Sequence, residues 1–232
     1  MDWTASVDIY CERTGPGLLA EPLNAVTNLS FFLAAWVGLV LARRAGKLTG
    51  SVRVLIGLTL AVGIGSTLFH TFAQRWAGAM DVLPILLFIV TYLFLALWRY
   101  FGMRWTEAAV LAFGFLFFAA GLRRAAAATL PPAFEPATGY LPALVALIAC
   151  GALLAARRRI VGAWLLGTGA VFAASLTFRA LDQRLCEQFA MGTHFMWHIL
   201  NGLVLGLLLA AWIRHGATAR GGQAVAGAAA PA

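Results

Sequence analysis

Long blocks of apolar residues, separated by short polar stretches, recur along the chain. Each block is long enough to cross about 30 Å of hydrocarbon as a helix. The pattern predicts seven membrane spans, at residues 23–42, 53–73, 81–99, 106–122, 139–156, 160–178 and 193–213. We therefore expect an all-α polytopic membrane protein, built as a seven-helix transmembrane bundle.

The remaining stretches are predicted to lie outside these helices. Residues 1–22 form an acidic N-terminal segment that lacks the basic start and apolar core of a cleavable signal. The fourth span is the shortest, and residues 123–138 carry three prolines, which predicts a loop. Residues 214–232 are rich in Gly and Ala, so we expect a disordered tail without a function.

Composition and charge support a membrane protein. Of the 232 residues, 62% are hydrophobic and only 11% are charged. A net charge of +8 would suit nucleic-acid binding, but the basic residues lie at the ends of the apolar blocks, as in membrane loops. We therefore expect no nucleic-acid partner.

The basic residues also predict an orientation. With the N-terminus outside, most Lys and Arg residues fall in the inner loops, including the triplet Arg157-Arg158-Arg159. The positive-inside rule then favours an outer N-terminus and a cytoplasmic C-terminus. Because the composition is rich in Ala, Arg and Gly, we expect a bacterial protein of the inner membrane.

Five polar residues are predicted to share one depth in the outer half of the bundle. His194 and His198 are four residues apart on the seventh span, which puts both imidazoles on one helix face. Ser66 and His70 have the same spacing at the end of the second span, and Asp81 opens the third. The three imidazoles would suit a zinc ion with one open position. Ser66 could then donate to an oxyanion, while Asp81 acts as a base or orients an imidazole.

Simpler explanations exist for each of these residues. A membrane histidine is often only hydrogen-bonded to a nearby oxygen, and a helical serine commonly bonds the carbonyl four residues back. Two facing histidines could also ligate haem iron, but Asp81 and Ser66 would then have no role. The shared depth of all five residues favours zinc. The fourth histidine, His215, is predicted at the opposite membrane face.

A second polar cluster precedes the first span. The carboxylates of Asp8, Glu12 and Glu21, with backbone carbonyls around Gly15-Pro16-Gly17, would suit a hard cation such as calcium. The alternative is a solvated acidic segment, in which the helix dipole favours Glu21 at the start of the first helix. Spacing alone leaves both interpretations open.

The three cysteines fall in two different settings. Cys11 and Cys186 are both predicted on the outer side, whereas Cys150 lies within the fifth span. An oxidising outer compartment would permit a disulfide between Cys11 and Cys186. Two unpaired thiols are the alternative.

These motifs make the chain similar to the alkaline ceramidases, within a wider superfamily of seven-span membrane hydrolases that includes the adiponectin receptors. The resemblance runs from about Asp8 to Leu209. It rests on Asp8-Ile-Tyr-Cys-Glu12, Ala20-Glu21-Pro-Leu-Asn24 with Asn28, Ser66-Thr-Leu-Phe-His70, Asp81, and His194-Phe-Met-Trp-His198. In one respect the chain departs from the eukaryotic enzymes, whose acidic segment is more compact and continues with polar calcium ligands, because Arg13 and Thr14 follow Glu12 here.

The resemblance implies a function and a set of site residues. It implies zinc on His70, His194 and His198, catalytic roles for Ser66 and Asp81, calcium near Asp8, Glu12 and Glu21, and a disulfide from Cys11 to the last outer loop. The implied activity is zinc-dependent hydrolysis of the amide bond of a ceramide-like lipid, which enters from the bilayer and yields a sphingoid base and a fatty acid. No obligate protein partner is implied.

Two other functions remain open at this point. One is a receptor-like seven-helix membrane protein in which zinc is structural. The other is the same hydrolytic chemistry on a different lipid ester or N-acyl amide, because specificity depends on the lining of the cavity.

Overall fold

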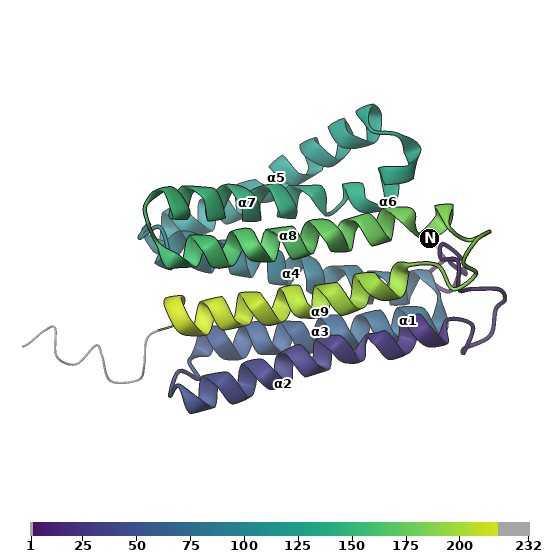
Figure 1. Cartoon of the computed structure of the whole chain (residues 1–232), viewed down its shortest axis with the longest axis horizontal. Coiled ribbons are helices and arrows are strands. Elements are labelled where there is room, and N and C mark those ends of the chain that lie inside the picture. Colours follow the sequence, from purple (N-terminus) through teal and green to yellow (C-terminus); the bar gives the residue numbers. More distant parts are fainter. Residues whose placement is uncertain (1, 218–232) are drawn as a thin grey trace, which may run out of the picture.

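Helices joined by short connections make up nearly all of the structure, a computed structural model that describes residues 2–217 (Figure 1). The elements are α1 (Pro22–Thr27), α2 (Leu29–Arg44), α3 (Gly50–Phe72), α4 (Arg75–Arg99), α5 (Trp105–Thr129), η1 (Pro132–Phe134), α6 (Glu135–Thr138), α7 (Leu141–Ala156), α8 (Ile160–Leu181), η2 (Asp182–Arg184), α9 (His194–Ala211) and η3 (Trp212–Gly216). Apart from an isolated bridge between Ser6 and Gln74, the described residues form no β-structure.

Six helical segments are long and apolar enough to cross a membrane. They are Pro22–Arg44, Gly50–Phe72, Arg75–Arg99, Trp105–Thr129, Ile160–Arg184 and His194–Gly216. A seventh apolar helix, α7, has 16 residues and is about 24 Å long, somewhat short of the hydrocarbon thickness. These segments coincide with the seven apolar blocks, so the prediction of an all-α polytopic membrane protein is confirmed.

The fourth span is longer than predicted. It was expected to be the shortest, followed by a loop over residues 123–138, but α5 has 25 residues and ends only at Thr129. The four alanines that follow Arg124 have the highest helix propensity of any residue, and they carry the helix onward. Leu130 then adopts an extended backbone because it precedes Pro131.

Two other predicted boundaries differ from the structure. The third span was expected to open at Asp81, but α4 begins at Arg75, so Asp81 lies well inside the helix. The predicted disordered tail lies outside the described residues from 218 onward, and the helical backbone of η3 continues to Gly216.

One end of the bundle collects the polar segments. The N-terminal segment, the last turn of α3, the end of α8 and the start of α9 all lie there, at the right of Figure 1. We call it the disulfide end, because Cys11 and Cys186 are joined there. At the opposite end the core is apolar, with Leu55, Leu165, Leu209 and Trp212 almost fully buried.

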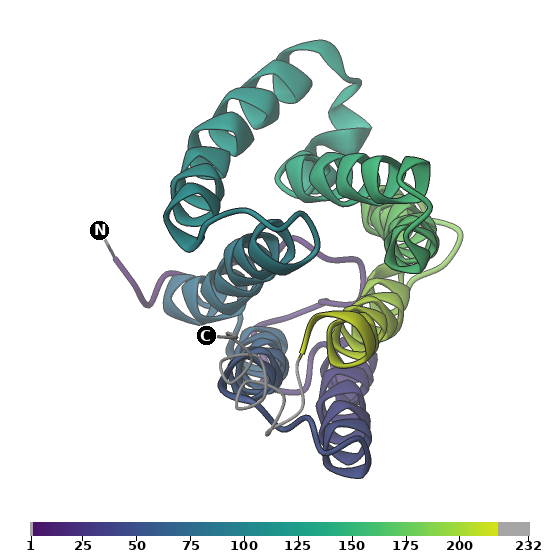
Figure 2. The same ribbon diagram turned by 90° about the vertical axis from the view of Figure 1, so that its left-hand side faces the viewer.

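Helix α5 stands away from the other helices (Figure 2). Its large apolar side chains are exposed, among them Val110, Phe113 and Phe117. Such a surface is stable only against hydrocarbon, because apolar side chains gain nothing from facing water. By contrast, α9 is the most buried of the spanning segments.

Small residues allow α3 and α4 to approach closely. A Cβ atom at Gly65 would overlap the backbone carbonyl of Met80, which directly precedes Asp81. Close approach through glycine is common between membrane helices, because dispersion contacts must replace the missing hydrophobic driving force. Gly65 therefore sets the distance between Ser66 and Asp81.

Substitution of Gly65 by alanine should destabilise the protein by about 1–3 kcal/mol, because the added methyl group forces α3 and α4 apart. The matched control is Gly57→Ala on the same helix, where a Cβ atom meets open space. Thermal unfolding in detergent measures both variants. Equal melting temperatures for the two would show that the contact at Gly65 is not tight.

Candidate metal centre

Three histidines converge at the disulfide end. His194 and His198 lie one turn apart at the start of α9, and His70 lies in the last turn of α3. Each is only 1% exposed, and one ligand atom from each lies within 4.8 Å of the others. They are the only group of this kind among residues 2–217.

One nitrogen of each imidazole has no hydrogen-bond partner. These buried atoms are Nε2 of His70, Nδ1 of His194 and Nε2 of His198. Leaving a buried polar atom unpaired is costly, so three such atoms in one place call for a shared partner. The group could hold a metal ion, and three imidazoles are a donor set that first-row transition metals accept.

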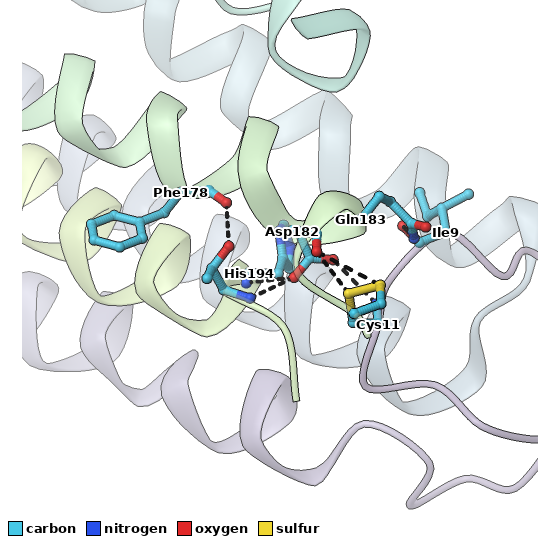
Figure 3. The surroundings of a disulfide bond; sticks show 8 residues. Ile9, Cys11, Phe178, Asp182, Gln183 and His194 are labelled. Carbon is cyan, nitrogen blue, oxygen red and sulfur yellow. Dashed lines mark hydrogen bonds between the residues drawn. A yellow bond between two sulfur atoms is a disulfide. The ribbon is translucent and has the colours of Figure 1, made fainter. Parts of the chain in front are cut away.

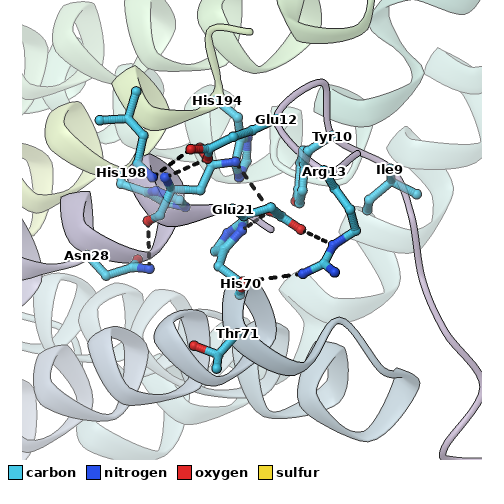
Figure 4. A network of polar contacts seen from close by, with 12 residues as sticks. Ile9, Tyr10, Glu12, Arg13, Glu21, Asn28, His70, Thr71, His194 and His198 are labelled. Atoms are coloured by element: carbon cyan, nitrogen blue, oxygen red, sulfur yellow. Dashed lines mark hydrogen bonds and ion pairs between the residues drawn. The ribbon is translucent and has the colours of Figure 1, made fainter. Parts of the chain in front are cut away.

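Glu21, directly before α1, and Thr27, at its end, orient two of these imidazoles, and Figure 4 shows the contact of Glu21 with His70. Nδ1 of His70 lies 2.5 Å from Oε2 of Glu21, and Nδ1 of His198 lies 3.0 Å from the hydroxyl of Thr27. A carboxylate on the far nitrogen is the usual partner of a metal-bound histidine, because it fixes the tautomer and the ring orientation. Glu21 is therefore a candidate orienting residue for His70.

Asp182 holds the start of α9 in place (Figure 3). Its Oδ1 accepts hydrogen bonds from the backbone N–H groups of Thr193 and His194, and its Oδ2 accepts one from Cys11. Gly192 has a positive φ of 61°, and a Cβ atom there would overlap the same carboxylate. Sequence reasoning missed Asp182, although a buried acid at the end of the sixth span, just before the His pair, was a usable signal.

A disulfide joins the N-terminal segment to this loop. Cys11 and Cys186 are bonded, with their Cα atoms 5.2 Å apart, while Cys150 is a free thiol. The bond ties the residues that precede Glu12 to the chain that leads into His194. It thus closes the disulfide end around the histidines.

Ser66 and Asp81 form a pair beside the histidines. Ser66 lies one turn before His70 on α3, and Asp81 lies on α4 where the close approach at Gly65 brings the two helices together. Ser66 is buried, whereas Asp81 is half-buried and lies outside the tight histidine group. The fourth histidine, His215, lies at the far end of the last helix, with its ring beside Trp164.

An apolar cavity of about 100 Å³ lies beside Trp197, which stands between His194 and His198 in the sequence, but none of the three histidines lines it. Its wall on α9 is one helix face, from Trp197 through Asn201 and Val204 to Leu208, which spans about 16 Å. Helices α4, α7 and α8 supply most of the remaining wall, including Phe88, Tyr92, Leu147 and Leu165. The cavity therefore extends from Trp197 along α9 towards the middle of the bundle.

Comparison with known protein families shows to which family the chain belongs. The ceramidase family model matches residues 3–226, which is nearly the whole sequence. The chain belongs to the ceramidase family. Comparison with curated proteins yields no significant match. Family membership supports a hydrolase that acts on a lipid in a membrane.

The structure of this ceramidase-family chain does not assemble the predicted calcium site. Asp8 is exposed, and both carboxylate oxygens of Glu12 accept hydrogen bonds from the backbone N–H groups of Leu23 and Asn24. Oε1 of Glu21 pairs with Nε of Arg13 at 2.5 Å. Glu12 and Glu21 thus have other partners and Asp8 is exposed, so the three carboxylates do not form a calcium site in this structure.

Burial and these contacts shift the pKa values of the carboxyl groups of Glu12 and Glu21 in opposite directions. Burial raises the pKa of Glu12, and the two backbone N–H donors partly offset that rise. Burial also raises the pKa of Glu21, while Arg13 lowers it. Glu12 acts as an anionic cap at the start of α1, where the unpaired N–H groups of a helix favour negative charge.

Aromatic rings and one arginine complete the surroundings of the histidines. The ring of Tyr10 stacks on His194 with centroids 3.8 Å apart, and burial raises the pKa of the Tyr10 hydroxyl. The guanidinium of Arg179 lies over the rings of Tyr10, Tyr140 and Trp197, at 5.9, 5.1 and 4.9 Å from their centroids. Sequence reasoning missed this cluster, because its rings come from three distant segments.

Replacing Asp182 by asparagine should weaken metal binding about tenfold or more, because an amide has only one acceptor oxygen and cannot serve both Cys11 and the backbone N–H groups at the start of α9. A competition titration with zinc measures this affinity. The control is Glu187→Gln, an exposed acid in the same loop, which should leave the affinity unchanged. An Asp182→Asn variant with wild-type affinity would contradict the orienting role.

Proposed function

We propose that this protein is a zinc-dependent amidase that hydrolyses the amide bond of ceramide-like lipids to a sphingoid base and a fatty acid. The observation that carries the proposal is the group of three unpaired imidazole nitrogens, on helices α3 and α9 that also contribute to the wall of an apolar cavity. Membership of the ceramidase family supports the class of reaction. The donor set of three histidines fits zinc with one open coordination position.

A zinc ion bound there would supply Lewis acidity and a water molecule with a pKa near 7. The protein's own residues supply orientation and proton transfer. Glu21 and Thr27 hold the rings of His70 and His198 through their far nitrogens. These contacts leave the unpaired nitrogens facing one another.

We assign proton transfer to Asp81 and stabilisation of the oxyanion to Ser66. The carboxylate of Asp81 accepts a proton from the attacking water and passes it to the leaving amide nitrogen as the C–N bond breaks. The hydroxyl of Ser66 donates a hydrogen bond to the developing oxyanion. The position of Ser66 one turn before His70, with Asp81 on the helix packed closely against α3, supports these roles.

We propose that the cavity binds a hydrocarbon chain of the substrate. Its walls are mostly apolar or aromatic, and it runs along α9, so it would take part of a chain that lies parallel to the helices. A lipid reaches it from the bilayer without crossing water. The same cavity would accept other N-acyl lipids or esters, so a lipid panel decides the substrate.

The active site is assigned to the outer half of a bacterial inner membrane, with the N-terminus outside. The disulfide supports this orientation, because such bonds persist in oxidising compartments. The triplet Arg157-Arg158-Arg159 lies at the opposite end, between α7 and α8, which agrees with the positive-inside rule.

Purified wild-type protein should carry about one zinc per chain and release a sphingoid base from ceramide. His198→Ala should lose both the metal and turnover. Ser66→Ala and Asp81→Asn should keep the metal but lose turnover by about 10²–10⁴-fold. Elemental mass spectrometry and a lipid hydrolysis panel measure the two properties, and His215→Ala serves as a control at the other end of the bundle.

A zinc-loaded protein that hydrolyses no lipid in the panel would favour the receptor-like alternative. Cleavage of an ester or another N-acyl amide in preference to ceramide would keep the chemistry and change the substrate. Full turnover by His198→Ala would rule out the proposal.

Ala96 provides a test of the cavity. It is buried on α4 and lines the cavity near the end remote from the histidines. Ala96→Leu should shorten the available space and lower kcat/KM for long acyl chains about tenfold or more relative to short ones. The control is Ala120→Leu on the exposed face of α5, which should leave the preference unchanged. If Ala96→Leu leaves the preference for acyl-chain length unaltered, the acyl chain of the substrate does not bind in this cavity.

A further inference from the structure

Arg13 is a buried cation in the N-terminal segment. Its side chain is 3% exposed, and it lies between the disulfide at Cys11 and the start of α1. A guanidinium keeps its charge at any ordinary pH, so this charge is a permanent feature of the fold. A buried permanent charge must be matched by its surroundings.

The guanidinium donates hydrogen bonds to four oxygen atoms, and Figure 4 shows the contacts with Glu21 and His70. Its Nε donates to Oε1 of Glu21 at 2.5 Å, and one terminal nitrogen donates to the backbone carbonyls of Gly15 and Gly17 at 3.1 and 3.4 Å. The other terminal nitrogen donates to the carbonyl of His70 at 3.4 Å. All partners are therefore acceptors, one carboxylate and three carbonyls.

This acceptor set is of the kind that a hard metal cation uses. Calcium binds carboxylate and backbone carbonyl oxygens in flexible loops. Glu21 and the carbonyls around Gly15-Pro16-Gly17 are among the groups that the sequence predicts around such a cation, together with Asp8 and Glu12. In the structure the guanidinium of Arg13 is placed among them instead.

We infer that Arg13 is a built-in cation that takes the place of calcium at the N-terminal segment of this protein. It neutralises Glu21, ties residues 13–17 to the end of α3, and holds Glu21 against His70. Arg13 is thus a positioning residue for the metal centre. The protein consequently needs no calcium to fold or to keep the histidines in place.

This inference goes beyond the proposed reaction, and its test does not depend on turnover. Calcium chloride is titrated into the zinc-loaded wild-type protein by calorimetry in chelator-treated buffer. Thermal unfolding is then recorded with and without calcium. We expect no binding heat and an unchanged melting temperature. Stoichiometric calcium binding, or a higher melting temperature in calcium, would overturn the inference.

Arg13→Ala tests the same role by removing the cation. The variant should melt at a lower temperature and bind zinc about tenfold more weakly, because Glu21 loses the partner that fixes it. Millimolar guanidinium or calcium should restore both properties, since either cation can enter the vacated space. Arg184→Ala, an exposed arginine at the same end, is the control and should match the wild type.

Two results with the variant would also overturn the inference. One is Arg13→Ala protein with the melting temperature and zinc affinity of the wild type. The other is a destabilised variant that neither cation restores, because a packing role alone would not respond to added charge. If Arg13→Ala does not fold, the calcium titration of the wild type decides the question by itself.

Discussion

The buried carboxylate of Glu21 is the contact on which the polar end of this bundle depends. One of its oxygens accepts from Arg13, and the other accepts from the side chain of Asn24 and meets Nδ1 of His70. Burying a carboxylate in an apolar bundle costs free energy unless the carboxylate is paired. Glu21 therefore keeps its partners in place, and they keep Glu21 in place. They join the N-terminal segment, the start of the first helix and the last turn of α3.

Asp182 makes a corresponding set of contacts for α9. It binds the backbone of Cys11, Thr193 and His194, and the adjacent disulfide fixes the same loop covalently. Glu21 and Asp182 therefore anchor the two helices that carry the histidines, and both are linked through the N-terminal segment. The result is a rigid group of imidazoles with one free nitrogen on each.

The apolar part of the bundle complements this polar end. Helix α9 carries the histidines at its start and the cavity wall along its next three turns, so one helix joins the metal centre to the lipid space. Exposed apolar side chains on α5 face outward, as expected for a helix in contact with lipid. A lipid substrate thus meets hydrocarbon-like surroundings until its polar group reaches the histidines.

The sequence by itself determined the spans, because apolar blocks of this length are stable only as membrane helices. Helical spacing also placed His194 beside His198 and Ser66 beside His70, since these pairs depend on one helix only. The tertiary structure decided which partner each buried charge takes. Arg13 reaches Glu21, and Asp182 reaches the start of α9, through contacts between segments far apart in the chain. Side-chain spacing cannot predict such contacts, because they depend on how the helix ends pack around the N-terminal segment.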